Sequence, residues 1–243
     1  MDVPPLAPGE AHVWRVPLVA AAAAIARARQ LLDAEETARV ALLAGVERQA
    51  RQVLSFGLLR MILSQYLHVE PKDILFMHTR TGKPRLGGRA ASSGLRFNVA
   101  HSAGMALFAV ALHAEIGVDI ERRRPPHDLE SMIETVLTPA EQLIVRTLPS
   151  ADRLRVFLDV WTLKEACLKA TGEGIAGLAR VEAILGVTGR ELVLGIRVPS
   201  TEAPLPWTVR RLNPNAGYSA AVVVTGPCTG VRQFALQPDL WLG

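Results

Sequence analysis

Apolar residues recur along the chain with the period of either a strand or a helix, and segments of the two kinds alternate. In the first half, one strand and three helices lead into a short strand and then into three strands in close succession. The second half again places three helices before a run of four strands. The predicted strands span 12–18, 74–77, 95–100, 105–111, 115–121, 183–185, 191–198, 207–212 and 218–224, and the predicted helices span 20–29, 34–43, 47–67, 128–136, 139–148 and 152–171.

The repeated order of helices followed by antiparallel strands predicts an α+β fold. We expect two similar α/β halves, residues 1–114 and 115–243, packed against each other as an intramolecular pseudo-dimer. The halves share no clear sequence repeat, so the duplication rests on the order of elements alone. Residues 81–84 are predicted to form a turn and residues 87–94 a loop.

The composition excludes several broad classes of protein. Apolar residues make up 49% of the chain and charged residues 21%, which argues against a disordered protein. A net charge of +4 suits an anionic ligand, an acidic protein partner or nucleic acid, although no Lys/Arg block is long enough for a nucleic-acid-binding arm. The only cysteines, Cys167 and Cys228, form neither a disulfide framework nor a zinc site, and Cys167 is expected to be buried on an apolar helix face.

The N-terminal region has none of the features of a targeting signal. Residues 1–10 carry acid and proline where a signal peptide carries positive charge. The apolar stretch 18–25 is much shorter than the ~20 residues that span a bilayer. We therefore expect a cytoplasmic protein without a membrane segment, and its two cysteines suit that reducing compartment.

The strand at 116–121 carries the first candidate chemistry. Because strand side chains alternate between faces, its three isoleucine and valine residues should face the core, while Gly117, Asp119 and Glu121 share the opposite face. Gly117 leaves space beside the carboxylates for a ligand or for another backbone. Two carboxylates on one face repel each other unless a cation lies between them, and Mg²⁺ prefers oxygen ligands. The alternative is a solvated edge strand whose acids pair with the arginines at 122–124.

The helix over residues 161–170 carries the second candidate chemistry. Four of its apolar residues have the spacing of a core-facing stripe, while Glu165 and Lys169, four residues apart, lie together on another side. Glu165 is a candidate third metal ligand, and Lys169 is a candidate cation for a phosphate group. The alternative is an ordinary surface salt bridge between these two side chains. The core-facing residues are predicted to be Leu163, Ala166, Cys167 and Ala170.

Further polar side chains lie at the end of the 95–100 strand and in the 81–84 turn. A protonated His101 can bind phosphate and Ser102 can donate a hydrogen bond, but no G-x-S-x-G segment supports a nucleophilic serine. Taken alone, His101 suits a surface or capping role, and Lys83 suits an ordinary turn residue.

The order and spacing of these segments resemble the 4'-phosphopantetheinyl transferase superfamily, in its single-chain Sfp-type branch. The resemblance covers about residues 12–225 and is strongest from 82 to 175. Its most specific elements are a G-V-D-x-E strand and a W-x-x-K-E-A-x-x-K helix, about forty residues apart. The matching segments are Gly82-Lys83-Pro84, Phe97-Asn98-Val99-Ala100-His101-Ser102, Gly117-Val118-Asp119-Ile120-Glu121, and Trp161-Thr162-Leu163-Lys164-Glu165-Ala166 with Lys169.

The resemblance implies transfer of the 4'-phosphopantetheine moiety of coenzyme A to a serine of an apo acyl carrier protein or peptidyl carrier domain, which releases 3',5'-ADP. It implies a Mg²⁺ ion, with Mn²⁺ as the alternative, held by Asp119, Glu121 and Glu165 at an active site between the two halves. Asp119, Glu165 and Lys169 are the implied catalytic residues, and the base is either Glu165 or a metal-bound water. The implied contacts of coenzyme A are Arg39, Arg51, Lys83, His101, Ser102 and Lys169.

Other features of the resemblance concern the nucleotide grip and the partner. Glu36 departs from the family, because it stands where a lysine could help to hold the nucleotide. The arginines at 122–124 are a candidate surface for an acidic carrier. The single-chain pseudo-dimer implies a monomer, and the sequence does not choose among fatty-acid, polyketide and nonribosomal-peptide carriers.

Two other functional classes compete with this one. A metal-dependent nuclease would also use Asp119 with basic surroundings, but this chain lacks a lysine two residues after Glu121, and the 161–170 helix would have no role. A non-catalytic module that holds coenzyme A or a carrier domain would not need the full set of acids and lysines. We therefore expect an enzyme that engages neither nucleic acid nor membrane.

Overall fold

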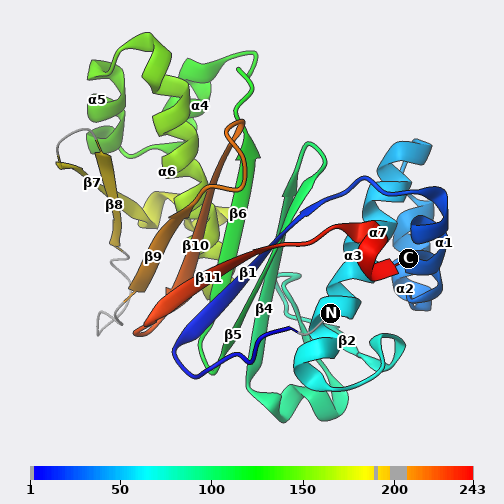
Figure 1. Ribbon diagram of the computed structural model, residues 1–243. Helices are drawn as coiled ribbons and strands as arrows, with labels where there is room; N and C mark the ends of the chain where they lie inside the picture. The colour runs from blue at the N-terminus through cyan, green and yellow to red at the C-terminus, as the bar shows by residue number, and fades with distance from the viewer. Residues whose placement is uncertain (1–2, 189–190, 198–206, 243) are drawn as a thin grey trace.

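The computed structural model describes residues 3–188, 191–197 and 207–242, and it places two main sheets between two groups of helices (Figure 1). The first sheet has the strand order β11-β1-β5-β4, and the second has the order β6-β10-β9. All pairings in these sheets are antiparallel except β1 with β11, which is parallel. The strands are β1 (Glu10–Pro17), β4 (Leu95–Ser102), β5 (Met105–Leu112), β6 (Ile116–Arg122), β9 (Trp207–Leu212), β10 (Tyr218–Thr225) and β11 (Gly230–Ala235).

One long helix packs on each main sheet. Helix α3 covers the first sheet, and α6 covers the second. Two-stranded hairpins, β2–β3 and β7–β8, lie outside the main sheets. The helices are α1 (Ala22–Gln30), α2 (Ala34–Ala41), α3 (Val46–Leu67), α4 (Leu129–Val136), α5 (Pro139–Thr147), α6 (Ser150–Thr171) and α7 (Pro238–Leu242); the hairpin strands are β2 (Phe76–His78), β3 (Pro84–Leu86), β7 (Glu182–Thr188) and β8 (Glu191–Arg197); and the 3-10 segments are Pro71–Asp73, Gly88–Ser93 and Ile175–Arg180.

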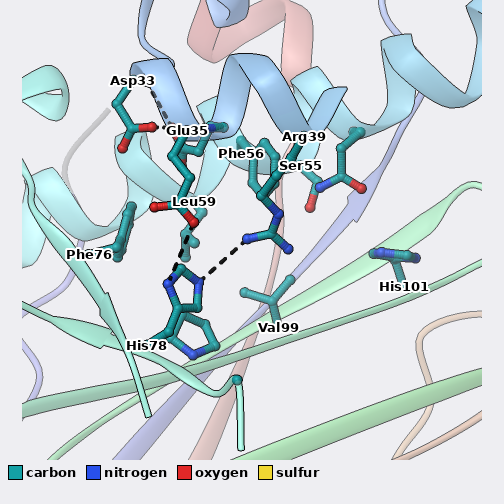
Figure 2. A pocket seen from close by; sticks show the side chains of 14 residues that line it. Asp33, Glu35, Arg39, Ser55, Phe56, Leu59, Phe76, His78, Val99 and His101 are labelled. Carbon is teal, nitrogen blue, oxygen red and sulfur yellow. Dashed lines mark hydrogen bonds and ion pairs between the residues drawn. The ribbon is translucent and has the colours of Figure 1, made fainter. Parts of the chain in front are cut away.

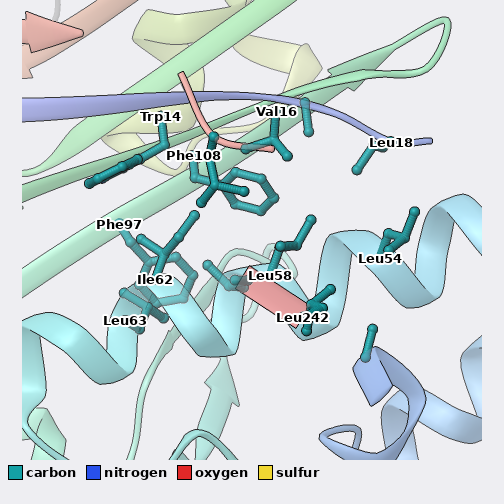
Figure 3. Packing of buried hydrophobic residues seen from close by; sticks show 14 of the residues in the cluster. Trp14, Val16, Leu18, Leu54, Leu58, Ile62, Leu63, Phe97, Phe108 and Leu242 are labelled. Atoms are coloured by element: carbon teal, nitrogen blue, oxygen red, sulfur yellow. The ribbon is translucent and has the colours of Figure 1, made fainter. Parts of the chain in front are cut away.

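Three apolar clusters hold these layers together. The first joins α3 to the first sheet, where Leu58 and Ile62 meet Trp14 and Phe108 (Figure 3). The second joins α6 to the second sheet, and it contains all four residues that the helical spacing predicts to face the core. The third is a layer of small and β-branched side chains between the two sheets, to which β1, β4, β5, β6, β9 and β10 contribute.

The α+β class and most of the predicted elements are confirmed. The segment predicted as a loop at 87–94 instead contains a 3-10 helix, Gly88–Ser93, and β3, β11 and α7 were not predicted. The predicted strand 191–198 is β8, except that Val198 lies outside the described residues. Among the described residues, no helix is both long and apolar enough to cross a membrane.

The chain returns to its N-terminal sheet at the end. Strand β11 pairs with β1 from Glu10 opposite Gly230 to Arg15 opposite Ala235. Leu242 of α7 lies in the same apolar cluster as α3. A division into halves at residues 114 and 115 remains a proposal, and these two C-terminal elements lie on the sheet of the other half.

The buried side chain of His12 makes the fold sensitive to acid. Its Nδ1 lies 2.8 Å from the Tyr66 hydroxyl, and burial lowers the pKa of His12 below its ordinary value of 6.5, with Arg232 adding to the effect and Glu10 opposing it. Since the unfolded chain protonates first, the free energy of unfolding should fall as pH drops below about 6.5, by at most about 1.4 kcal/mol per pH unit. Urea unfolding at several pH values should show a smaller decrease for His12→Gln, and equal decreases would contradict this assignment.

Candidate active site

Strand β6 carries its two kinds of side chain on the predicted faces. Ile116, Val118 and Ile120 lie in the apolar layer between the sheets. Gly117 faces α6 so closely that a Cβ atom there would lie 1.9 Å from the carbonyl oxygen of Ala166. The space beside the carboxylates is therefore filled by the backbone of α6, which brings the helix against the acid-bearing strand.

A methyl group at Gly117 should force β6 and α6 apart. We expect Gly117→Ala to lower the free energy of unfolding by about 1–3 kcal/mol, because backbone atoms of α6 cannot move aside as a flexible side chain would. Gly217→Ala is the matched control, since a Cβ atom at that position would have no other atom within 4 Å. Denaturant unfolding of both variants tests this, and equal stabilities would show that the contact is not restrictive.

The side chain of Asp119 extends from β6 toward α6, and it is almost fully buried. Its Oδ1 accepts a hydrogen bond from Nζ of Lys169 at 2.5 Å. Its Oδ2 is buried and has no hydrogen-bond partner among the described residues. Burial raises the pKa of Asp119 to about 7, Lys169 opposes this rise, and the charges of Glu121 and Glu165 add to it. An uncompensated buried carboxylate oxygen of this kind is suited to a cation.

Glu121 and Glu165 lie near the same carboxylate. The Oε2 atom of Glu121 accepts a hydrogen bond from the Ser102 hydroxyl at 2.9 Å, which ties the end of β4 to β6. Burial raises the pKa of Glu165 above its ordinary value, Lys169 lowers it, and the charge of Glu121 raises it further. The surface salt bridge considered for Glu165 and Lys169 gives way to the contact between Lys169 and Asp119.

The chemistry of these three carboxylates suits a divalent cation. The charges of Glu121 and Glu165 raise the pKa of Asp119, and Asp119 has a buried free carboxylate oxygen, so the three carboxylates form the type of oxygen donor set that Mg²⁺ prefers. Across the described ranges, no group of three His, Cys, Asp or Glu side chains is already arranged as a metal site. In this arrangement the ammonium of Lys169 supplies the positive charge beside Asp119.

A series of adjoining cavities leads away from the acids. The cavity that contains Glu165 and Lys169 is also lined by Gly82, Pro84 and Val99. The same three residues line a second cavity between α2, α3 and the β2–β3 hairpin. Figure 2 shows Arg39 linked to His78 across this second cavity, with His101 beyond Val99, and the Nη1 of Arg39 lies 3.4 Å from Nε2 of His78. Arg39 and the two histidines therefore line this second cavity together with acidic side chains, namely Asp33, Glu35 and Glu36.

The series ends at two arginines of α3. His101 and Gln52 line the second cavity and also a third, which contains Arg48 and Arg51. Arg51 forms an ion pair with Glu47, one helical turn away. The proposed nucleotide contacts Arg39, Arg51 and His101 thus follow one another along the cavities, although at a distance from the three acids.

Glu36, which stands where a lysine could help to hold the nucleotide, and Lys83, a predicted nucleotide contact, both pair with other side chains. Glu36 is buried, where it accepts hydrogen bonds from Nε of Arg60 at 2.8 Å and from the backbone N–H of Asp33 at 3.1 Å. It therefore caps α2 and neutralises a buried arginine. The ammonium of Lys83, in the β2–β3 turn, lies 2.9 Å from Oε2 of Glu115.

Several residues that were not predicted from the sequence hold the site together. The side chain of Asn98 accepts a hydrogen bond from the backbone N–H of Val118 at 2.9 Å, which joins the edges of the two sheets. Lys164 is fully buried and pairs with Glu141 at 2.8 Å. The segment from Thr138 to Glu141 has the T-x-x-E pattern of a capping box, and this was the one local signal that could have identified Glu141.

Known proteins similar to this chain share one activity in their names. Residues 115–223 match the family model of the 4'-phosphopantetheinyl transferase superfamily. The chain is 38% identical over 233 residues to the 4'-phosphopantetheinyl transferase HetI of Nostoc sp. (strain PCC 7120 / SAG 25.82 / UTEX 2576), which covers 96% of this chain and 92% of that protein. It is 31% identical over 178 residues to the 4'-phosphopantetheinyl transferase psf-1 of Bacillus pumilus, covering 73% of this chain and 72% of that protein.

Among solved structures, the holo-[acyl-carrier-protein] synthase (AcpS) of Thermotoga maritima is similar to part of the chain. The match covers 46% of this chain and 62% of that one, with 23% sequence identity and a TM-score of 0.37. The long, high-identity match to the Nostoc protein carries the assignment. The chain therefore belongs to the 4'-phosphopantetheinyl transferase superfamily, in its Sfp-type branch.

Proposed function

We propose that the protein transfers the 4'-phosphopantetheine moiety of coenzyme A to a serine of an apo acyl carrier protein or peptidyl carrier domain. The products are the holo carrier and 3',5'-ADP, and the reaction depends on Mg²⁺, with Mn²⁺ as the alternative. The observation that carries the proposal is that Asp119, Glu121, Glu165 and Lys169 lie close together beside a series of cavities that contains Arg39, His101 and Arg51.

The roles of the acids follow from charge. Asp119, Glu121 and Glu165 are the proposed ligands of the metal ion, which when bound supplies positive charge to the pyrophosphate of coenzyme A. The carrier serine attacks the phosphorus that bears the pantetheine arm, and the bond from that phosphorus to the bridging oxygen breaks. Glu165 or a metal-bound water is the candidate base for the serine proton, and burial raises the pKa of Glu165, which makes its carboxylate a better proton acceptor.

Lys169 is the proposed cation for the phosphate being transferred. Its side chain is 30% exposed and already lies at the carboxylate of Asp119, so it can exchange that contact for a phosphate oxygen. We expect Lys169→Met to lower kcat about 10²-fold with a smaller change in the KM for coenzyme A, since the lysine acts on developing charge. Steady-state kinetics with both substrates varied would measure this, and an unchanged turnover would remove the role.

The proposed nucleotide contacts are Arg39, Arg51, His101 and Ser102. The first three line the two cavities that follow the cavity at Glu165 and Lys169. Ser102 supports Glu121 through its hydroxyl, so a contact with the pyrophosphate would accompany that hydrogen bond. For the carrier, Arg122 and Arg124 are exposed, whereas Arg123 faces the buried carboxylate of Asp159.

The setting of the enzyme is also part of the proposal. Both helix-covered sheets come from one chain, which suits a monomer. We propose that it acts in the cytoplasm on protein carriers, without nucleic acid or membrane as a partner.

Mass spectrometry of an apo carrier protein tests the proposed function directly. The carrier is incubated with the protein, coenzyme A and Mg²⁺, and a gain of the phosphopantetheine mass on its serine is expected. Parallel reactions omit the metal or use heat-denatured protein. An unmodified carrier in a panel of fatty-acid, polyketide and nonribosomal-peptide carriers would refute the activity, and cleavage of plasmid DNA in the same buffer would favour a nuclease instead.

A further inference from the structure

The ammonium of Lys83 is surrounded by acceptors from two other elements. Its Nζ lies 2.9 Å from Oε2 of Glu115, 3.1 Å from the carbonyl oxygen of Ala170 and 3.5 Å from the carbonyl oxygen of Ile116. Its side chain is only 8% exposed. A lysine ammonium has three N–H donors, and each has an acceptor here, so none remains for a phosphate group.

The acceptors of Lys83 depend on this contact. Ala170 lies in the last turn of α6, where carbonyl oxygens lack helical partners and a cation is favourable. Ile116 begins β6, the strand that carries the acids. One side chain thus connects the end of the helix that bears Glu165 with the start of the strand that bears Asp119.

Glu115 is itself held firmly. Its Oε1 accepts hydrogen bonds from Nη1 of Arg85 at 2.7 Å and from Nε of Arg96 at 3.2 Å. These arginines belong to β3 and β4, so the carboxylate links these two strands to the start of β6 beside Lys83. Withdrawing the ammonium from this group would leave a buried acceptor and break a connected network.

The turn that contains Lys83 forms a wall of the cavities. Gly82 and Pro84, on either side of it, line both the cavity at Glu165 and the cavity at Arg39. The backbone N–H of Lys83 donates to the Thr79 hydroxyl at 3.0 Å, which closes the turn on itself. Lys83 also lines the cavity at Glu165, but its ammonium is engaged there by acceptors of Glu115, Ile116 and Ala170.

We infer that Lys83 is a positioning residue, which fixes the β2–β3 turn against the strand and helix of the acids and does not bind a phosphate of coenzyme A. This inference rests on the proposed function, which makes coenzyme A the substrate. It assigns the same role to Glu115, which no sequence motif marked. Both side chains affect the binding of coenzyme A only by holding the β2–β3 turn in place.

Comparing coenzyme A with an analogue that lacks its 3'-phosphate distinguishes a positioning residue from one that contacts this phosphate. We compare kcat/KM for coenzyme A and for 3'-dephospho-coenzyme A in Lys83→Met and in Glu115→Gln, and their ratio is the discrimination factor. Both variants should lower kcat/KM for both cofactors about 5- to 10-fold, through a misplaced turn, and leave the discrimination factor within about twofold of wild type. Lys72→Met, an exposed lysine, should change neither value.

His101→Ala provides the opposite control, because a side chain that contacts the 3'-phosphate should lower the discrimination factor. The inference is overturned if Lys83→Met lowers that factor as well, or if Glu115→Gln keeps the wild-type kcat/KM for both cofactors. Should Lys83→Met fail to fold, Glu115→Gln still decides. Wild-type protein that modifies no carrier would refute the proposed function, and calorimetric binding of the two cofactors then tests Lys83 by the same ratios.

Discussion

Asp119→Asn and Glu165→Gln are each expected to lower the rate of phosphopantetheine transfer by about 10³-fold or more while the protein stays folded. Both substitutions keep the shape of the side chain and remove one negative charge from the proposed metal site. The effect should be large because Asp119 is almost fully buried, so water cannot replace the missing charge. Single-turnover transfer to a purified apo carrier gives the rate without the contribution of product release.

Two further measurements make this result specific. Glu70→Gln, an exposed acid away from the cavities, should transfer at the wild-type rate. Electron paramagnetic resonance of added Mn²⁺ should show binding to wild type in the presence of coenzyme A and much weaker binding to both site variants. If both variants kept near-full activity, the three acids could not be the metal site, whatever their spacing.

Lys164→Met should cause a large loss of stability. Lys164 and Glu141 are fully buried and lie 2.8 Å apart, and Lys164 also donates to the carbonyl oxygen of Val136 at 3.0 Å. Removing only the lysine leaves a buried carboxylate without its cation, which costs about 3–5 kcal/mol. Urea unfolding followed by circular dichroism would measure the change.

The double variant Lys164→Met/Glu141→Gln distinguishes the cost of an unpaired buried charge from the cost of altered packing. It should recover part of the loss, because no charge is then left unpaired, although Glu141 also accepts hydrogen bonds from the backbone N–H groups of Thr138 and Ala183. Lys72→Met should stay within about 0.5 kcal/mol of wild type. A Lys164→Met protein as stable as Lys72→Met would show that the motif lysine has no structural role.

Local patterns predicted the faces of the site elements well. The period of two placed the carboxylates of β6 opposite its isoleucine and valine residues, and the helical period placed the apolar stripe of α6 in the core. These predictions succeeded because one face of each element is buried, which fixes the periodicity. Gly117 was recognised as a site of close approach, and the structure assigns that approach to the backbone of α6.

Tertiary partners could not be predicted in the same way. Spacing alone paired Lys169 with Glu165, but the shape of the β6–α6 contact directs its ammonium to Asp119. Lys83 was matched to a nucleotide contact, although its partners Glu115 and Ala170 come from distant parts of the chain. Strand β11 was missed because its pairing with β1 crosses almost the entire sequence. None of these contacts leaves a local signal.

The parallel pairing of β11 with β1 has a consequence for biosynthesis. Until β11 has been translated, β1 presents a free edge with unpaired backbone groups, next to the aromatic rings of Trp14 and His12 that Phe234 later covers. The N-terminal sheet therefore cannot finish folding on the ribosome while the rest of the chain is being made. Nascent chains of this protein should therefore expose that edge until β11 has emerged and pairs with it.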